Sequence, residues 1–114
     1  MICAIKRKEQ NVVKKYDYSV VLDTELGKRN GTMQLSVNGT SIDGFLSLLN
    51  NTESCHGIIQ NDGRCLLQGK IVTLIKEIVY DATGYIRENE IALILKIEKN
   101  TFRLKGVALP KMSE

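Results

Sequence analysis

Several residue types are scarce in this sequence of 114 residues, which has no tryptophan, one proline and one histidine. Its apolar runs are all too short to span a bilayer, and the opening run MICAI is too short for a secretory signal. The three cysteines are an odd number, which fits a reducing compartment. We therefore expect a cytoplasmic protein with no membrane partner.

Excess charge of one sign is confined to the start of the chain. Residues 1–15 carry five basic groups and one acid, which leaves eleven basic and twelve acidic residues for the other ninety-nine. A nucleic-acid surface needs Lys and Arg gathered on the fold. We expect a basic N-terminal tail over 1–15, one domain over 16–110, and no nucleic-acid partner; binding of nucleic acid through the tail is the alternative.

Motifs of common enzymes are also missing. There is no Gly-x-Ser-x-Gly, no phosphate-binding loop and no spaced His-Glu pair. The strand registers described below turn Asp43, Asp81 and Glu90 outward, so no inward carboxylate pair is expected. The sequence predicts a protein that is not an enzyme and needs no cofactor, with a hydrolase of unrecognised type as the alternative.

The sequence is rich in β-branched residues punctuated by Asn-Gly and Asp-Gly, a profile typical of strands and tight turns. Asn30-Gly31 and Asn38-Gly39 are interpreted as turns rather than glycosylation sites. The pattern predicts an all-β chain of about eight sequential antiparallel strands. The expected strands cover residues 16–23, 31–37, 40–49, 54–60, 64–75, 78–87, 90–97 and 101–109.

Each predicted hairpin register can be tested by asking whether it places apolar residues opposite one another. The test is sensitive, because a slip of one residue would move every side chain of the strand to the other face of the sheet. The predicted turns are Asn38-Gly39, Glu88-Asn89 and Lys99-Asn100, and the predicted pairs include Leu35 with Ile42, Ile86 with Ile91 and Leu95 with Leu104. The apolar residues then share one face of a continuous meander.

Residues 71–79 allow two interpretations, because their apolar positions also fit the stripe of an amphipathic helix. We favour two strands, since β-branched residues dominate and no helix cap frames the segment. A turn at Lys76-Glu77 would place Gly69 opposite Gly84 and Thr73 opposite Tyr80.

A meander with one apolar face is expected to close, because closure removes two exposed edges and gives the inward face a shared core. The segments DGFLSLL, QGKIVTLI, ATGYI and LKGVALP, joined by short turns, resemble small up-and-down β-barrels of the streptavidin-like and calycin class. The chain lacks the Gly-x-Trp start of lipocalins and the tryptophans of a biotin pocket, so the resemblance implies the barrel without implying biotin.

The stretch NNTESCHGIIQNDGRC gathers the only histidine and two cysteines. A two-residue turn at Asp62-Gly63 would put His56 on the inward face opposite Gly69 and turn Cys55 outward. Cys55 and Cys65 would lie about 16 Å apart along the ladder, too far for a disulfide. We expect neither a metal site nor a Cys-His nucleophile here.

The functional prediction is a barrel that binds a small, mostly apolar ligand in its interior. The polar groups expected to line that site are His56, Tyr18, Thr73 and Tyr80. The alternative is a side-chain-filled barrel that works as a homo-oligomer, since many apolar residues are expected on its outer face. These outward residues are Phe45, Leu49, Ile59, Leu66, Val72, Leu74, Val79 and Ile94.

Overall fold

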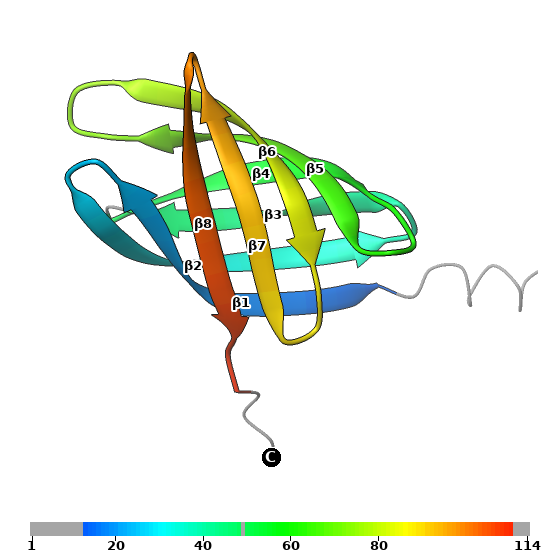
Figure 1. Ribbon diagram of the computed structural model, residues 1–114. Helices are drawn as coiled ribbons and strands as arrows, with labels where there is room; N and C mark the ends of the chain where they lie inside the picture. Colours follow the sequence, from blue (N-terminus) through cyan, green and yellow to red (C-terminus); the bar gives the residue numbers. More distant parts are fainter. Residues whose placement is uncertain (1–12, 49, 111–114) are drawn as a thin grey trace, which may run out of the picture.

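The computed structural model describes residues 13–48 and 50–110 and confirms an all-β fold. Eight antiparallel strands follow one another in a single meander, and β1 pairs with β8 to close a barrel (Figure 1). The strands are β1 (Lys14–Thr24), β2 (Gly27–Asn38), β3 (Ser41–Leu48), β4 (Asn51–Ile59), β5 (Arg64–Val72), β6 (Glu77–Ile86), β7 (Glu90–Ile97) and β8 (Asn100–Ala108).

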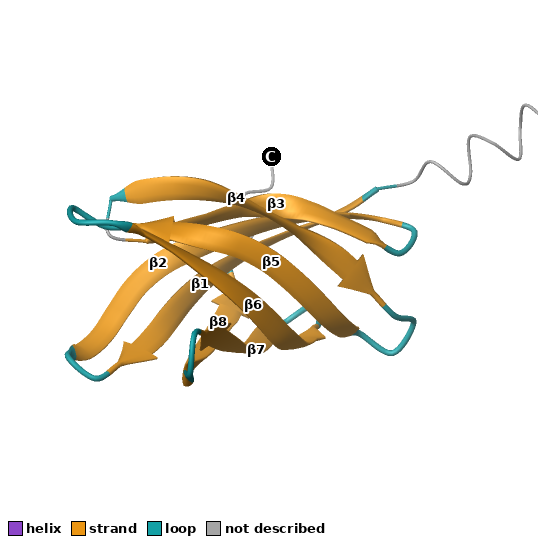
Figure 2. Cartoon of the chain, turned by 90° about the horizontal axis from the view of Figure 1, so that it is seen from above, coloured by secondary structure: helices purple, strands orange, loops and turns teal. Residues whose placement is uncertain are grey.

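The barrel consists of two four-stranded halves. The ladders β4–β5 and β1–β8 have five residue pairs each, whereas β1–β2 has eleven and β5–β6 nine. These two short ladders separate β1–β4 from β5–β8. The two halves run in different directions, so that β7 and β8 cross steeply over β1 to β4 (Figures 1 and 2).

Alternate residues of the strands fill the interior with apolar side chains. Twenty described residues are buried, and none of them is charged or has an amide side chain. The side chains with the least exposure come from all eight strands, so the core is shared by both halves. They include Tyr18, Leu35, Ile42, Leu67, Tyr80, Leu93 and Leu104.

The outward set is largely as predicted. Phe45, Leu66, Leu74, Val79 and Ile94 are exposed. Val72 is half-buried and Leu49 lies outside the described residues, while Ile59 packs against the core instead of facing out.

The predicted hairpins form, and one of the three tested registers is correct. Around Glu88-Asn89, Ile86 pairs with Ile91 as expected. At the other two, the turn lies one residue from its predicted place, so Leu35 pairs with Gly44 and Leu95 with Phe102. Each error shifts the register by two residues. A shift of two preserves the face of every side chain, which is why the core was still predicted.

Residues 71–79 are not helical, and the predicted hairpin forms with a wider tip. Val72 pairs with Glu77 across a loop at residues 73–76. The predicted pairing of Gly69 with Gly84 is wrong, because Gly69 pairs with Tyr80 and the register has slipped by four. The Thr73 hydroxyl sets the wider tip by accepting hydrogen bonds from the amides of residues 75 and 76. Because the register has slipped by an even number of residues, the same side chains face inward and the barrel still closes.

The prediction of a turn at Asn30-Gly31 is wrong, because both residues lie inside β2. The chain turns at residues 25–26, where the Thr24 hydroxyl donates to the Gly27 carbonyl at 2.6 Å. Gly31 is needed for a different reason. A Cβ at this position would lie 2.1 Å from the Ser47 carbonyl oxygen on β3, so the two strands approach closely here.

The N-terminal boundary differs slightly from the expected tail. β1 begins at Lys14, so residues 14 and 15 belong to the barrel, while residues 1–12 lie outside the described part of the chain. No helix within the described ranges has the length and hydropathy of a membrane span.

Candidate functional site

The β4–β5 turn decides where the histidine points. Gln60 N donates to the Arg64 carbonyl and Gly63 N to the Gln60 carbonyl, at 2.8 and 3.0 Å, which closes a three-residue loop with Gly63 at φ +94°. Compared with a two-residue turn, a loop of three residues moves every side chain of one strand to the opposite face of the sheet. The prediction that His56 faces inward is therefore wrong: His56 is exposed, and Cys55 is buried opposite Gly69.

The two described cysteines are free, in agreement with the expected absence of a Cys55–Cys65 disulfide. Cys55 is 2% exposed and Cys65 8% exposed. Burial raises the pKa of each thiol to about 11, and the nearby Asp43 carboxylate adds to the effect at Cys55. A thiol at neutral pH is a poor nucleophile, so neither cysteine is suited to covalent catalysis.

The four residues predicted to line a ligand site do not share one cavity. His56 is on the outer surface, while Tyr18 and Tyr80 are buried inside. The Tyr80 ring lies over Gly69, whose Cβ position would be 2.6 Å from the Tyr80 hydroxyl, and this hydroxyl has no hydrogen-bond partner. Thr73 borders a hollow at one end of the barrel.

One end of the barrel, which we call the closed end, comprises the turns at residues 39–40, 60–63 and 87–89. Backbone bonds join each turn to the neighbouring hairpin: Ile59 N to Thr40 O, Ile86 N to Gly63 O, and Ala108 N to Asn89 O, each at 2.9 Å. Tyr18 stacks parallel to Tyr16 and donates its hydroxyl proton to the Arg87 carbonyl. Burial raises the pKa of Tyr18, which keeps this donor neutral.

The opposite end, which we call the open end, comprises the turns after β1, β3, β5 and β7. The last inward-facing residues of seven strands surround a hollow of about 340 Å³ here. Its apolar wall consists of Leu22, Leu48, Ile71, Ile78, Ile97 and Phe102. Leu26 from the β1–β2 turn lies at the rim.

Four polar residues also border this hollow: Thr24, Glu25, Arg29 and Thr73. Both threonine hydroxyls are engaged by their own turns, where each accepts an amide proton and donates to a carbonyl. Arg29 was missed because residues 24–30 were interpreted as a loop. Counting back by twos from the inward Met33 would have placed Arg29 on the inward face.

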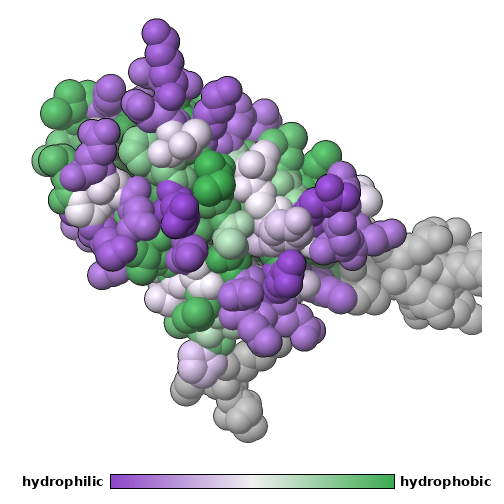
Figure 3. All heavy atoms as spheres, in the orientation of Figure 1, coloured by the Kyte–Doolittle hydropathy of each residue, from purple (hydrophilic) through white to green (hydrophobic). Residues whose placement is uncertain are grey.

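The tips of the open end expose aliphatic side chains to an unusual degree. Leu26 is 85% exposed, and Leu74 and Ile75 are 105% and 91% exposed. The two tips have the same construction, since a threonine hydroxyl closes each one and holds the aliphatic residues outward. Hydrophobic residues gather over the β5–β6 turn in the surface view (Figure 3).

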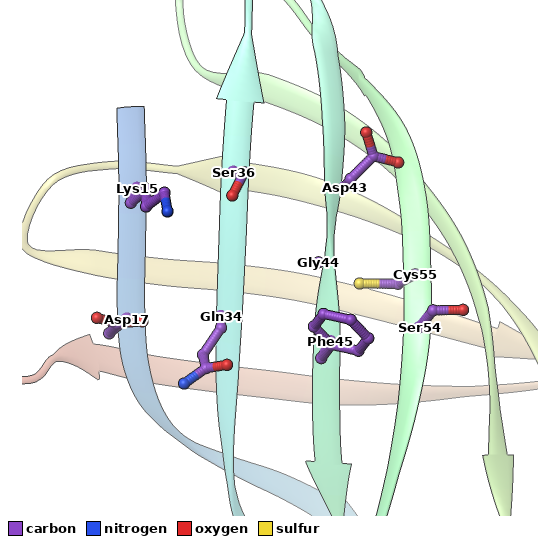
Figure 4. A pocket seen from close by; sticks show the side chains of 9 residues that line it. All are labelled: Lys15, Asp17, Gln34, Ser36, Asp43, Gly44, Phe45, Ser54 and Cys55. Carbon is purple, nitrogen blue, oxygen red and sulfur yellow. The ribbon is translucent and has the colours of Figure 1, made fainter. Parts of the chain in front are cut away.

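A second hollow of about 550 Å³ lies on the outer face of β1 to β4, and most of the residues that line it are polar (Figure 4). Outward side chains surround the bare backbone of Gly44, among them Lys15, Asp17, Asp43 and Phe45. No ion pair within 4.0 Å joins the charged groups of this hollow. Likewise, no three described His, Cys, Asp or Glu residues are placed to hold a metal ion.

Comparison of the chain with protein-family models, with curated proteins and with solved structures gave no match.

Proposed function

We propose that this protein is a non-enzymatic β-barrel that binds a small, mostly apolar ligand at its open end. The observation that carries the proposal is the hollow of about 340 Å³, walled by six apolar side chains and open at the rim. Small-molecule sites are mostly apolar, largely preformed and about 300–1,000 Å³ in size. Eight-stranded barrels of the streptavidin-like and calycin class have room for one such ligand, and we include that likeness in the proposal.

Two neighbouring residues of β6 provide a matched test. Ile78 faces the hollow, whereas Val79 faces solvent and is 72% exposed. Ile78→Trp should fill the hollow and abolish the binding of a neutral naphthylamine probe measured by fluorescence. Val79→Trp should bind the probe as the wild type does. Absence of probe binding to the wild-type protein, or equal binding by both variants, would contradict the proposal.

Ligand binding should also raise the thermal midpoint, because a ligand that binds only the folded state stabilises it by mass action. The rise should increase with probe concentration in the wild-type protein and in Val79→Trp, and should be absent in Ile78→Trp.

A second candidate function, homo-oligomer assembly, is favoured by the outer face of β4 to β7. Ile58, Leu66 and Ile94 belong to one row of cross-strand partners and are 40–54% exposed. Exposed apolar rows of this kind commonly mark contact surfaces. If the row is an interface, light scattering should detect a dimer that Leu66→Glu converts to a monomer, while Phe45→Glu on the other half leaves it intact. A wild-type monomer would refute this candidate.

A further inference from the structure

The hollow contains one charged side chain that comes from the inward face of a strand. Arg29 lies in β2 opposite Leu22, which is 6% exposed and belongs to the core. Two and four residues further along β2, the inward positions are Gly31 and the buried Met33. Arg29 therefore continues an apolar row to the lip of the barrel and ends it with a guanidinium group.

The protein gives this guanidinium group little to bind. Among the described residues, its one hydrogen bond is a long one of 3.5 Å, from Nη1 to the Lys28 carbonyl. No carboxylate of the described residues lies within ion-pairing distance of it. Asp23 on the adjoining strand is paired with Lys28 at 2.7 Å on the outer face. Since a guanidinium has five N–H donors, most of the binding capacity of Arg29 is unused.

The other polar groups at the rim are poorer candidates for a ligand contact. The Thr24 and Thr73 hydroxyls are both donating and accepting within their own turns. Glu25 lies in the turn itself, where it is exposed and belongs to no inward row. Arg29 is thus the polar group bordering the hollow that lies in an inward row and keeps unused donors.

We infer that the ligand is an amphiphile whose apolar part occupies the hollow and whose anionic group, such as a carboxylate, binds to Arg29. This inference rests on the proposed function. A guanidinium and a carboxylate match in geometry, because two parallel N–H donors can face two oxygens. The partly apolar surroundings of the half-buried Arg29 strengthen such a contact relative to one in bulk water.

Three probes with the same ten-carbon tail and different head groups test the inference: decanoate, decanol and decyltrimethylammonium. Their affinities can be measured by displacement of the neutral naphthylamine probe at pH 8, where a carboxylic acid is ionised. Decanoate should bind about tenfold more tightly than decanol, a ratio typical of one charge-assisted contact. Decyltrimethylammonium should bind most weakly.

Two substitutions identify the residue responsible. Arg29→Met retains an unbranched apolar stem without the charge, so the affinity for decanoate should fall about tenfold to that of decanol, whose own affinity should not change. Lys28→Met is the matched control, because Lys28 is 71% exposed and paired with Asp23 on the outside. It should leave all three affinities as they are.

The possible failures are distinguishable. If wild-type protein binds all three probes equally, or prefers the cation, or if Arg29→Met leaves the preference for decanoate intact, this inference is overturned while the binding site stands. If the naphthylamine binds and none of the three probes displaces it, this inference is likewise overturned; if the naphthylamine itself does not bind to the wild-type protein, the proposed function fails. Thermal midpoints of both variants close to the wild-type value would exclude unfolding as the cause of any loss.

Discussion

The two ends of the barrel differ in how their turns are anchored. At the closed end, each of the three turns is joined to the next hairpin by one backbone hydrogen bond, and a fourth bond joins Leu109 N to the Asp17 carbonyl. At the open end, the Thr24 and Thr73 bonds remain within single turns, although Asn51 Nδ2 donates across to the Val72 carbonyl. The same meander therefore produces one end in which the hairpins are joined and another in which their tips stand apart.

The side chains differ in the same sense. Tyrosine rings fill the closed end, where Tyr18 is fully buried and hydrogen-bonded to the Arg87 carbonyl. At the open end, aliphatic side chains and Phe102 surround a hollow, and Leu74 and Ile75 project into solvent. Because apolar burial stabilises the fold and an open apolar hollow does not, we interpret the closed end as the stabilising region, and the open end is the region for which we propose ligand binding.

The largest effect is expected when an aromatic ring is removed from each end. Tyr18→Ala should lower the free energy of unfolding by about 3–5 kcal/mol, because it leaves a cavity in a closely packed site. Phe102→Ala should cost only about 1–2 kcal/mol, since this ring is half-buried beside space that is already open. Chemical denaturation of both variants measures the difference. Equal losses would mean that the two ends are packed alike.

Alkaline pH should reveal how well the interior excludes water. The buried thiols of Cys55 and Cys65 have pKa values raised from 9.0 to about 11. Between these values the unfolded chain loses protons that the folded protein keeps, so stability should be complete below pH 9 and should fall as pH rises toward 11. We expect a loss of about 2 kcal/mol per thiol over this interval.

Single Cys55→Ala and Cys65→Ala variants provide the control for this pH effect. Each should make the plot of unfolding free energy against pH less steep between pH 9 and 11, whatever its effect on stability at pH 8. A plot as steep in both variants as in the wild-type protein would show that other groups cause the alkaline loss.

The loop that sets the closed end should be sensitive to backbone conformation. Gly63 has φ +94°, and a Cβ there would also lie 2.9 Å from the Ile86 carbonyl oxygen. Gly63→Ala should therefore cost about 1–2 kcal/mol. Gly63→Asn should cost less, because asparagine tolerates positive φ better than alanine does. Equal stability of wild-type and Gly63→Ala proteins in thermal unfolding would show that this conformation is unimportant.

This loop also explains why the sequence predicted the barrel but misplaced the histidine. Alternation of apolar residues fixes which face of a strand is buried, and errors of two or four residues at the turns around residues 39, 74 and 98 did not change it. The turn at residues 61–63 has an odd length. A two-residue and a three-residue loop are both compatible with Asp62-Gly63, and the choice exchanges His56 for Cys55 on the inward face.

The open hollow was beyond sequence reasoning for a related reason. Its wall depends on where strands end, and strand ends depend on local bonds such as those of the Thr24 hydroxyl. The expected loop at residues 24–30 left Arg29 unassigned, although it lies in a strand. Alternation shows that Leu22 and Phe102 face inward, but how much space remains between them depends on how the two halves of the barrel cross.

The smallest effect is expected from one substitution made at two tyrosines. Tyr18→Phe removes a hydroxyl that donates to the Arg87 carbonyl, so it should lower stability by about 1 kcal/mol. Tyr80→Phe removes a buried hydroxyl that has no partner, so it should leave stability unchanged or raise it by up to about 1 kcal/mol. Denaturation curves of the two variants compare the signs directly. A loss of stability in Tyr80→Phe as large as in Tyr18→Phe would mean that the Tyr80 hydroxyl also forms a hydrogen bond in solution. A buried tyrosine hydroxyl would then stabilise a part of the interior outside the closed end as well.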